Sequence, residues 1–557
     1  MQFRWNHTQG APDYDRETGF GFVTGAVYTA DAALHIPETN SGFLPLWWYA
    51  GTPIFDIRQS EYGRQATAAE ALRTEDAAGR RLPVWLRIQV PGEGVYRAEI
   101  TVTGTDGGEV LVFTGRRRLA WRGVLPAGAQ QIVTAYCDVF PIVPRGQADA
   151  VASDAVNIAV VGGALSAVAL AEAPHTRRIW VCGDSTVTDQ TGELPYAPGT
   201  SYAGWGQMLP AYLPEVCITN HAHSGLTTES FLSEGHWAIV KPRLRAGDIC
   251  LFQFGHNDQK LAHLQARGGY TDRLRTYIKE TRAAGAVPVL ITPLARNSWR
   301  DPTHYNDFLA DFADAVLDLG KEEAVPVLDL HAYAMQLIRQ EGLETAKRWF
   351  YPGDYTHTND FGAYRMAGFV AGALGKAVGL PVADSPAWTP APPFAPLTPP
   401  KDCALPAPDT DPFADYDATR PQEVLTRAEA LELAIKALKL FPINVYNDLY
   451  ADIVGHETYA GTVQCAAQND LIPAAWIADG RLYPQRTVTA ADFLAVLMPG
   501  AAGRRPLAAP SPLPDSVPAY ARFAAGQAVA EQLISADSLN DPITRSDAAA
   551  LCRRLHI

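Results

Sequence analysis

The sequence has no apolar run that approaches the roughly 20 residues a helix needs to cross a bilayer. This excludes a protein held in the membrane by helices of its own. The first residues, Met1 to His7, also lack the basic segment and apolar core of a secretory signal peptide. We therefore expect a cytoplasmic location, with export as the alternative if a signal has been removed.

The sequence has few cysteines, and its 46 basic residues are outnumbered by 60 acidic ones. The seven cysteines are odd in number and not closely spaced, which favours reduced, buried thiols over a disulfide framework or a zinc site. The formal net charge of −14 argues against nucleic acid or an anionic membrane as a partner. An acidic polysaccharide stays compatible with this charge if the groove that binds it is locally basic.

The chain is too long for one hydrophobic core, since it has 557 residues, so several domains are expected. Residues 1–172 contain short runs that alternate apolar and polar side chains, such as 84–90 and 109–114. Pro91 to Gly94 forms a turn between two of them. This pattern predicts an antiparallel β-sandwich, either a packing module or a ligand-binding one.

From 173 to 383 the rhythm changes to short apolar runs separated by amphipathic segments. The predicted strands are 179–182, 216–219, 249–254, 287–291 and 325–330, and the predicted helices include 270–284, 305–319 and 361–378. Strands that alternate with helices predict an α/β fold with a doubly wound parallel sheet.

The last third of the chain contains a proline-rich segment and a helical region. Residues 384–424 predict an extended linker, or else an ordered strap along the preceding domain. In 425–557, Thr426, Thr489 and Thr544 each precede an acidic residue by three positions, which is typical of a capping box at a helix start. Their spacing of roughly 55 to 65 residues predicts a small domain of repeated helix pairs.

Ser185 is the first candidate for a catalytic residue. It follows the predicted strand 179–182 and the turn glycine Gly183, where open α/β sheets place their ligands. This placement suits a nucleophile, although Gly-Asp-Ser is also ordinary turn chemistry.

Two more loops follow the next two strands and supply hydrogen-bond donors. Gly225 can present a bare backbone N–H, and Asn257 can aim its side-chain amide into the same cleft. Together with the N–H of Ser185, these donors would form an oxyanion hole. Taken alone, Asn257 is more readily interpreted as a cap of the following helix.

Asp354 and His357 precede the last predicted helix of this region with a spacing of three. His357 is placed to accept the proton of Ser185, while Asp354 fixes the tautomer of the ring. Separately they are read as a helix cap and a surface histidine. The joint order of Ser, Gly, Asn and Asp-x-x-His, each after its strand, favours catalysis.

This joint pattern resembles the SGNH, or GDSL, hydrolases, and within them the rhamnogalacturonan acetylesterase group. The blocks that carry the resemblance are 183–187, 204–207, 255–258, 291–296 and 354–357. One departure is Leu226-Thr227-Thr228, where that group often has Gly-Arg-Ser, so an arginine contact to substrate is missing here.

The resemblance implies a flavodoxin-like three-layer fold, a triad of Ser185, Asp354 and His357, and an oxyanion hole of Ser185, Gly225 and Asn257. It implies an esterase that removes acetyl groups from plant cell-wall polysaccharide or oligosaccharides, most of all acetylated pectin, and acetyl xylan otherwise. Further substrate-binding candidates are Asp184, Thr186, Trp205, His256 and Trp299.

The flanking regions carry resemblances of their own. Residues 1–172 resemble galactose-binding-like sandwiches, and 425–557 resemble S-layer homology repeats, which implies binding to cell-wall polysaccharide, or self-association if that function is lost. Ala490 stands where the repeat motif carries arginine. An exported chain would then be associated with the wall.

The sequence is also compatible with two rival functions. One is a carbohydrate-binding or wall-anchoring protein with a vestigial site, and the other is a lipid or acyl-thioester hydrolase. No metal or other cofactor is expected, because His221, His223, His256 and His263 lack a ligand spacing such as His-Glu-x-x-His.

Overall fold

The computed structural model describes residues 2–23, 64–68, 71–75, 81–143, 149–190, 192, 196–261, 263–301, 304–390, 411–438, 440, 449–454, 457–503 and 505–555. The chain divides into two compact units. The first comprises residues 1–258, 264–297 and 308–398, and the second comprises 259–263, 298–307 and 399–557. Within the described ranges, no helix has the length and hydropathy needed to span a membrane.

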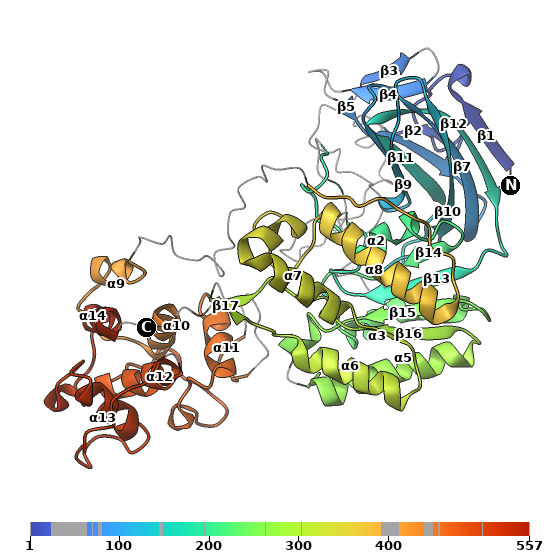
Figure 1. Cartoon of the computed structure of the whole chain (residues 1–557). Coiled ribbons are helices and arrows are strands. Elements are labelled where there is room, and N and C mark those ends of the chain that lie inside the picture. Colours follow the sequence, from blue (N-terminus) through green and yellow to red (C-terminus); the bar gives the residue numbers. More distant parts are fainter. Residues whose placement is uncertain are drawn as a thin grey trace. The chain divides into compact units, whose positions relative to one another are not determined.

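The first unit begins with two antiparallel sheets, as the alternating runs predict (Figure 1). Their strands are β1 (Gln2–Asn6), β2 (Phe20–Phe22), β3 (Arg64–Ala68), β4 (Ala71–Glu75), β5 (Arg81–Leu82), β6 (Val84–Gln89), β7 (Gly94–Gly104), β8 (Glu109–Thr114), β9 (Arg118–Val124), β10 (Gln130–Val139), β11 (Ala155–Val161) and β12 (Gly163–Glu172). One sheet runs β10-β7-β12-β4-β3, with β1 and β5 at its sides, and the other runs β2-β6-β11-β8-β9. Alternate residues such as Ile100, Val112 and Ile158 form a shared core.

A parallel sheet follows in the order β14-β13-β15-β16-β19, which is the 2-1-3-4-5 order of doubly wound folds. Its strands are β13 (Arg178–Gly183), β14 (Cys217–Asn220), β15 (Ile249–Gln253), β16 (Val287–Ile291) and β19 (Val327–Leu328). The predicted parallel sheet is confirmed. β13, β14 and β15 are buried throughout, because helices cover the sheet, and this explains their continuous apolar runs.

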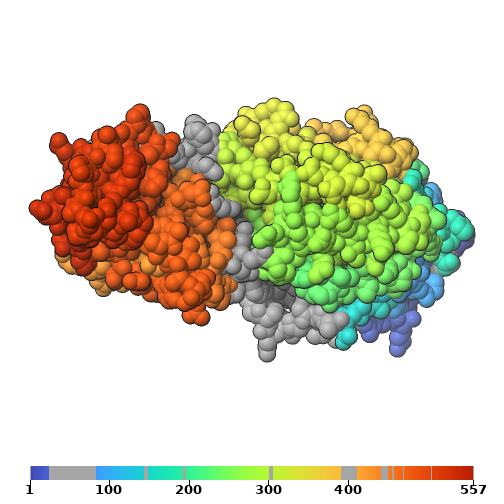
Figure 2. Space-filling model, turned by 90° about the horizontal axis from the view of Figure 1, so that it is seen from below, coloured from blue at the N-terminus to red at the C-terminus, as the bar shows by residue number. Residues whose placement is uncertain are grey.

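Helices lie on both faces of this sheet, with α7 and α8 on one face and α5 and α6 on the other (Figure 1). The helices of this region are α2 (Trp205–Met208), α3 (Ser230–Ser233), α4 (His236–Val240), α5 (Thr271–Ala283), α6 (Ala310–Glu322), α7 (Leu330–Ala346) and α8 (Asp360–Val378). Figure 2 shows one side of the region as a green-to-yellow surface.

One predicted helix starts later than expected. The segment 305–319 was predicted to be helical throughout, but α6 begins at Ala310. The residues before it form a small antiparallel hairpin of β17 (Trp299–Asp301) and β18 (His304–Tyr305). The hydrogen bonds of this hairpin hold Tyr305 in extended backbone, which overrides the helical pattern of the side chains.

The proline-rich segment is described only at its two ends, because 391–410 lie outside the described residues. Its start packs within the first unit: Trp388 contacts the rings of Phe361 and Tyr364 and donates from Nε1 to Glu109 Oε2 at 3.2 Å. Arg122 Nη1 donates to the carbonyl of Pro386 at 2.7 Å. The strap interpretation therefore holds for the start of this segment.

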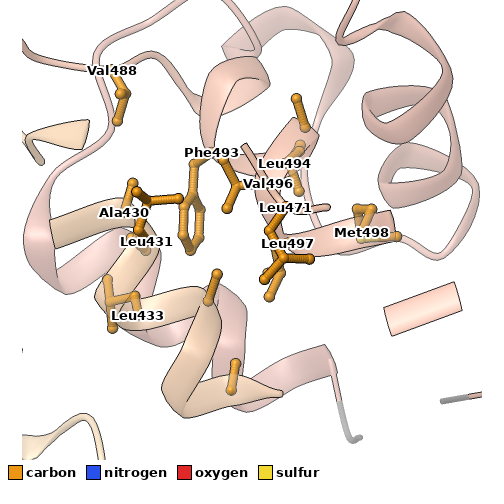
Figure 3. Packing of buried hydrophobic residues seen from close by; sticks show 14 of the residues in the cluster. Ala430, Leu431, Leu433, Leu471, Val488, Phe493, Leu494, Val496, Leu497 and Met498 are labelled. Atoms are coloured by element: carbon orange, nitrogen blue, oxygen red, sulfur yellow. The ribbon is translucent and has the colours of Figure 1, made fainter. Parts of the chain in front are cut away.

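The second unit contains a helical region with α9 (Ala414–Ala418), α10 (Arg427–Ala437), α11 (Ala460–Gln468), α12 (Ala490–Ala502), α13 (Arg522–Ala530) and α14 (Arg545–Leu555). Thr426 with Glu429 and Thr489 with Asp492 form complete capping boxes, as the sequence predicts. Figure 3 shows Phe493 of α12 beside Ala430 and Leu431 of α10, and Leu497 of α12 beside Leu471.

Candidate active site

Ser185 lies two residues beyond the carboxyl end of β13, in a tight turn. Gly183 is required there, because a Cβ at this position would come within 2.6 Å of the carbonyl of Gln253. The Asp184 carboxylate then accepts the backbone N–H of Thr186 at 2.9 Å and its hydroxyl at 2.8 Å. These bonds fix the turn that raises Ser185 above the sheet edge.

His357 and Asp354 meet Ser185 in a continuous chain of hydrogen bonds. Ser185 Oγ lies 2.8 Å from His357 Nε2, and His357 Nδ1 lies 2.7 Å from Asp354 Oδ2. The other carboxylate oxygen of Asp354 accepts the backbone N–H groups of Thr356 at 2.7 Å and His357 at 2.9 Å. The spacing of three thus closes a turn that places the carboxylate beside its own histidine.

The carboxyl group of Asp354 is stabilised in its ionised form. Burial by itself raises the pKa of Asp354, but His357 and the two backbone N–H groups outweigh it and lower the pKa to about 2. The ionised carboxylate accepts a hydrogen bond from the N–H at Nδ1 of His357. This leaves Nε2 with a lone pair directed at the Ser185 hydroxyl whenever the ring is neutral.

The loops of Gly225 and Asn257 are tied to the Ser185 turn. Gly225 is exposed and has a φ of +84°, the left-handed conformation that favours glycine. The N–H of His223 donates to the carbonyl of Gly183 at 3.1 Å. Asn257 Nδ2 donates to the carbonyl of Leu226 at 3.1 Å, so the three loops form one linked edge.

Four further predicted site residues form a buried network under Ser185. The side chains are those of Asp184, Thr186, Trp205 and His256, each at most 2% exposed. His256 Nδ1 lies 3.2 Å from Asp184 Oδ2, and Gln253 joins the other two by accepting from Trp205 Nε1 at 2.7 Å and donating to the Thr186 hydroxyl at 2.8 Å. These bonds tie the side chains to one another and to the Ser185 turn, and their roles in substrate binding stay predictions.

Trp299, the fifth of these candidates, lies on β17. It is 6% exposed and packs edge to face on Tyr305, with ring centroids 5.6 Å apart. A role for Trp299 in substrate binding stays a prediction.

Asp258 links the Asn257 loop to the segment after Gly225. Its carboxylate accepts the N–H and hydroxyl of Thr228, at 2.8 and 2.6 Å, and the N–H of Gly255 at 3.1 Å. Complete burial raises the pKa of Asp258 to about 7, although the bonds from Thr228 oppose the rise.

Two aromatic residues that the sequence did not single out lie beside His357. The ring of Tyr202 is perpendicular to His357, with centroids 5.7 Å apart, and it stacks on Tyr351 at 3.6 Å. Tyr202 reaches this place because Ala203 exchanges hydrogen bonds with Thr358, next to His357. Only the neighbouring motif at 204–207 could have drawn attention to it.

The histidines considered for metal binding pack against different neighbours. His221 packs on Trp180 and His223 packs near His236, while His263 is exposed. Across the described ranges, no three His, Cys, Asp or Glu side chains form a group that could hold a metal.

A family model, that of the GDSL-like lipase/acylhydrolase family, matches residues 181–365. The chain is 33% identical over 222 residues to rhamnogalacturonan acetylesterase RhgT of Bacillus subtilis (strain 168), covering 37% of this chain and 93% of that protein. It is 26% identical over 368 residues to the uncharacterized esterase YxiM of the same organism, covering 64% of this chain and 82% of that protein.

Among solved structures, an acetylxylan esterase from Geobacillus stearothermophilus is 19% identical to this chain, with a TM-score of 0.28. The match covers 37% of this chain and 94% of that one.

Proposed function

The chain belongs to the GDSL-like lipase/acylhydrolase family and is a serine esterase, and we propose that it removes acetyl groups from acetylated pectin of the rhamnogalacturonan type. The observation that carries this proposal is the chain of hydrogen bonds from Ser185 through His357 to Asp354, at 2.8 and 2.7 Å. The choice of substrate is supported by the relative named for that activity, of which the chain covers 93%.

In the first half of the proposed reaction, His357 Nε2 takes the proton of Ser185 as Oγ attacks the acetyl carbonyl carbon. The carbonyl oxygen becomes an oxyanion, which accepts hydrogen bonds from the N–H groups of Ser185 and Gly225 and from the amide of Asn257. As the carbonyl reforms, the bond to the sugar oxygen breaks, and protonated His357 donates its proton to that oxygen.

In the second half, water hydrolyses the acetyl group on Ser185. His357 removes a proton from the water, whose oxygen attacks the acetyl carbonyl carbon through the same oxyanion. The ester bond to Oγ then breaks, acetate leaves, and the proton returns to Ser185. Asp354 stays ionised throughout at neutral pH, because its pKa is lowered to about 2.

The buried network of Asp184, Thr186, Trp205 and His256 supports this reaction from below. We assign it the task of holding the nucleophile turn and the Asn257 loop in register, since its side chains bond to each other across both loops. The contacts that select the sugar are then made by residues on the solvent-exposed side of the site.

Acetate release from defined polymers tests the proposed substrate. The wild type should release acetate faster from acetylated rhamnogalacturonan than from acetyl xylan or acetyl mannan, and Ser185→Ala should release none above background. Ser233→Ala, an exposed serine on α3, is the matched control and should behave as wild type.

Three outcomes would redirect the proposal. Preference for acetyl xylan would make the chain an acetylxylan esterase, and preference for long-chain over short-chain acyl nitrophenyl esters would make it a lipid hydrolase. Binding of polysaccharide without hydrolysis of any ester would leave a carbohydrate-binding or wall-anchoring protein with a vestigial site.

A further inference from the structure

The tip of one sandwich hairpin places three consecutive arginines inside the first unit. Arg116 and Arg117 lie between β8 and β9, and Arg118 begins β9. The three residues are 8%, 0% and 6% exposed, in chain order. Burying a guanidinium group is unfavourable unless ionic or hydrogen-bonding partners compensate, so the partners of this turn indicate what it does.

Arg117 binds an acid and two backbone carbonyls of the catalytic region. Its Nη1 donates to Asp360 Oδ1 at 2.5 Å, and both side chains are completely buried. Its Nη2 and Nε donate to the carbonyls of Tyr202 at 2.5 Å and Gln190 at 2.9 Å. The hydroxyl of Tyr196 also donates to Asp360 Oδ1, at 2.9 Å.

Asp360 and Tyr202 are both neighbours of His357, the first along the chain and the second through a ring contact. Asp360 is the first residue of α8 and lies three positions after His357, so its place sets where the histidine loop ends. Tyr202 holds its ring perpendicular to His357 at 5.7 Å. Arg117 therefore anchors the base from two sides without touching it.

The two flanking arginines anchor the loop of the nucleophile. Arg116 Nε and Arg118 Nε donate to the same oxygen of Asp189, at 3.1 and 2.8 Å. Asp189 is four residues after Ser185, and its other oxygen accepts from Asn220 Nδ2 at 2.8 Å. The hairpin thus binds the end of the Ser185 loop and the end of the His357 loop at the same time.

We propose that the 116–118 turn fixes the separation of Ser185 and His357, and that Arg117 is a positioning residue for the reaction. The sandwich is then a structural part of the esterase site as well as a neighbouring domain. This inference rests on the proposed function, because it requires that Ser185 and His357 react together.

The test compares two buried arginines of the sandwich in the full chain. Arg117→Met should lower kcat for nitrophenyl acetate about 10- to 100-fold, because displacement of a catalytic group by about 1 Å has an effect of this size. KM should stay within about twofold, since the Arg117 side chain is completely buried and has no surface to offer a substrate. Arg87→Met is the control: Arg87 is 4% exposed and pairs with Asp154 inside the sandwich, so it should lower the melting temperature and leave kcat at wild-type level.

A double-mutant cycle tests whether Arg117 acts through Asp360. Asp360→Asn should lower kcat as Arg117→Met does, and the double variant should be hardly worse than either. Arg117→Lys keeps the charge and should recover part of the lost kcat, and it replaces Arg117→Met if that chain does not fold.

Wild-type kcat in a folded Arg117 variant would overturn the proposal, as would a cycle in which the two losses add fully. Failure of every Arg117 variant to fold would also overturn it and make the residue a requirement of the fold. Wild-type hydrolysis of nitrophenyl acetate keeps these results separate from a failure of the proposed function.

Discussion

Ser185 and His357 are 172 positions apart and share one hydrogen bond, so removing either should disable the same step. Ser185→Ala should lower kcat by about 10³- to 10⁶-fold, with His357→Ala similar and the double variant hardly worse than either. Steady-state kinetics on nitrophenyl acetate, with circular dichroism as a check of folding, measures this. Losses that multiply in the double variant would show that the two side chains act in separate steps.

Asp258 and Asp354 should shift stability in opposite directions with pH. The pKa of Asp354 is lowered to about 2, so its stabilising contribution is complete above its unfolded pKa and is lost as the pH falls through 2. The pKa of Asp258 is raised to about 7, so its contribution is complete below its unfolded pKa and is lost as the pH rises through 7. Only the loss of stability through Asp258 falls near neutral pH.

Urea unfolding at pH 5 and pH 8 tests the effect of Asp258. Between these values the wild type should lose on the order of 3 kcal/mol through this group, which is the effect of about two pKa units. Asp258→Asn should lack that part of the pH dependence, whereas Asp272→Asn, whose side chain is 65% exposed on α5, should keep it. An unchanged pH dependence in Asp258→Asn would assign the loss of stability to other groups.

At the scale of the elements, the helices of the second unit depend on their caps. Thr489 accepts the N–H of Asp492, and the carboxylate of Asp492 accepts the N–H of Thr489 in return. Thr489→Ala should therefore lower the unfolding free energy by about 1 kcal/mol. Thermal unfolding measures it, and Thr489→Ser, which keeps the hydroxyl, should lose much less. Equal losses in both variants would indicate that the methyl group matters instead.

The elements also show what the sequence can predict. The strands from β13 to β16 were predictable, because strands buried on both faces consist of continuous apolar runs and each ends in a polar loop. The late start of α6 was not, because the hydrogen bonds of the β17–β18 hairpin depend on pairing that side-chain periodicity does not record.

Two properties limit the prediction of the site from sequence: the direction in which a side chain points, and its pairing with residues far away along the chain. Ser185, Asp354 and His357 were found from order and spacing, and the structure brings them together. The bonds of His256 to Asp184 and to the carbonyl of Leu294 were not predictable, because a motif gives a loop position without the direction of its side chain. The role of Arg117 was not predictable, because its acidic partner lies 243 residues away.

At the scale of the whole molecule, every residue of the proposed reaction precedes the proline-rich segment. A chain that ends at residue 390 should therefore keep nearly all hydrolysis of nitrophenyl acetate. A chain that ends at residue 383 should keep activity but melt at a lower temperature, because it loses Trp388 and its packing on Phe361 and Tyr364. Loss of activity in the longer fragment would indicate that the helical region takes part in the site.

The arginines of the helical region bear on whether it binds a cell wall. Arg427 is 5% exposed and donates to the carbonyls of Trp476 at 2.6 Å and Leu482 at 2.5 Å, while Arg545 is 7% exposed and pairs with Glu429. Since these groups hold the region together, we expect 425–557 to be a packing or pairing module. Purified 425–557 should not sediment with peptidoglycan that carries its wall polymer. Tight sedimentation, unchanged by further washing, would establish a wall-bound protein.

The burial of the 116–118 turn also has a consequence for how the chain is made. The sandwich leaves the ribosome before the catalytic region, and the acid that pairs with Arg117 follows Arg117 by 243 residues. At about 5–20 residues per second, this interval lasts on the order of 12–50 s. During that time a folded sandwich has an arginine side chain without its carboxylate. We therefore expect the site to assemble only after Asp360 has been made, and slowing synthesis between residues 117 and 360 should prolong the period in which the nascent chain is open to proteases.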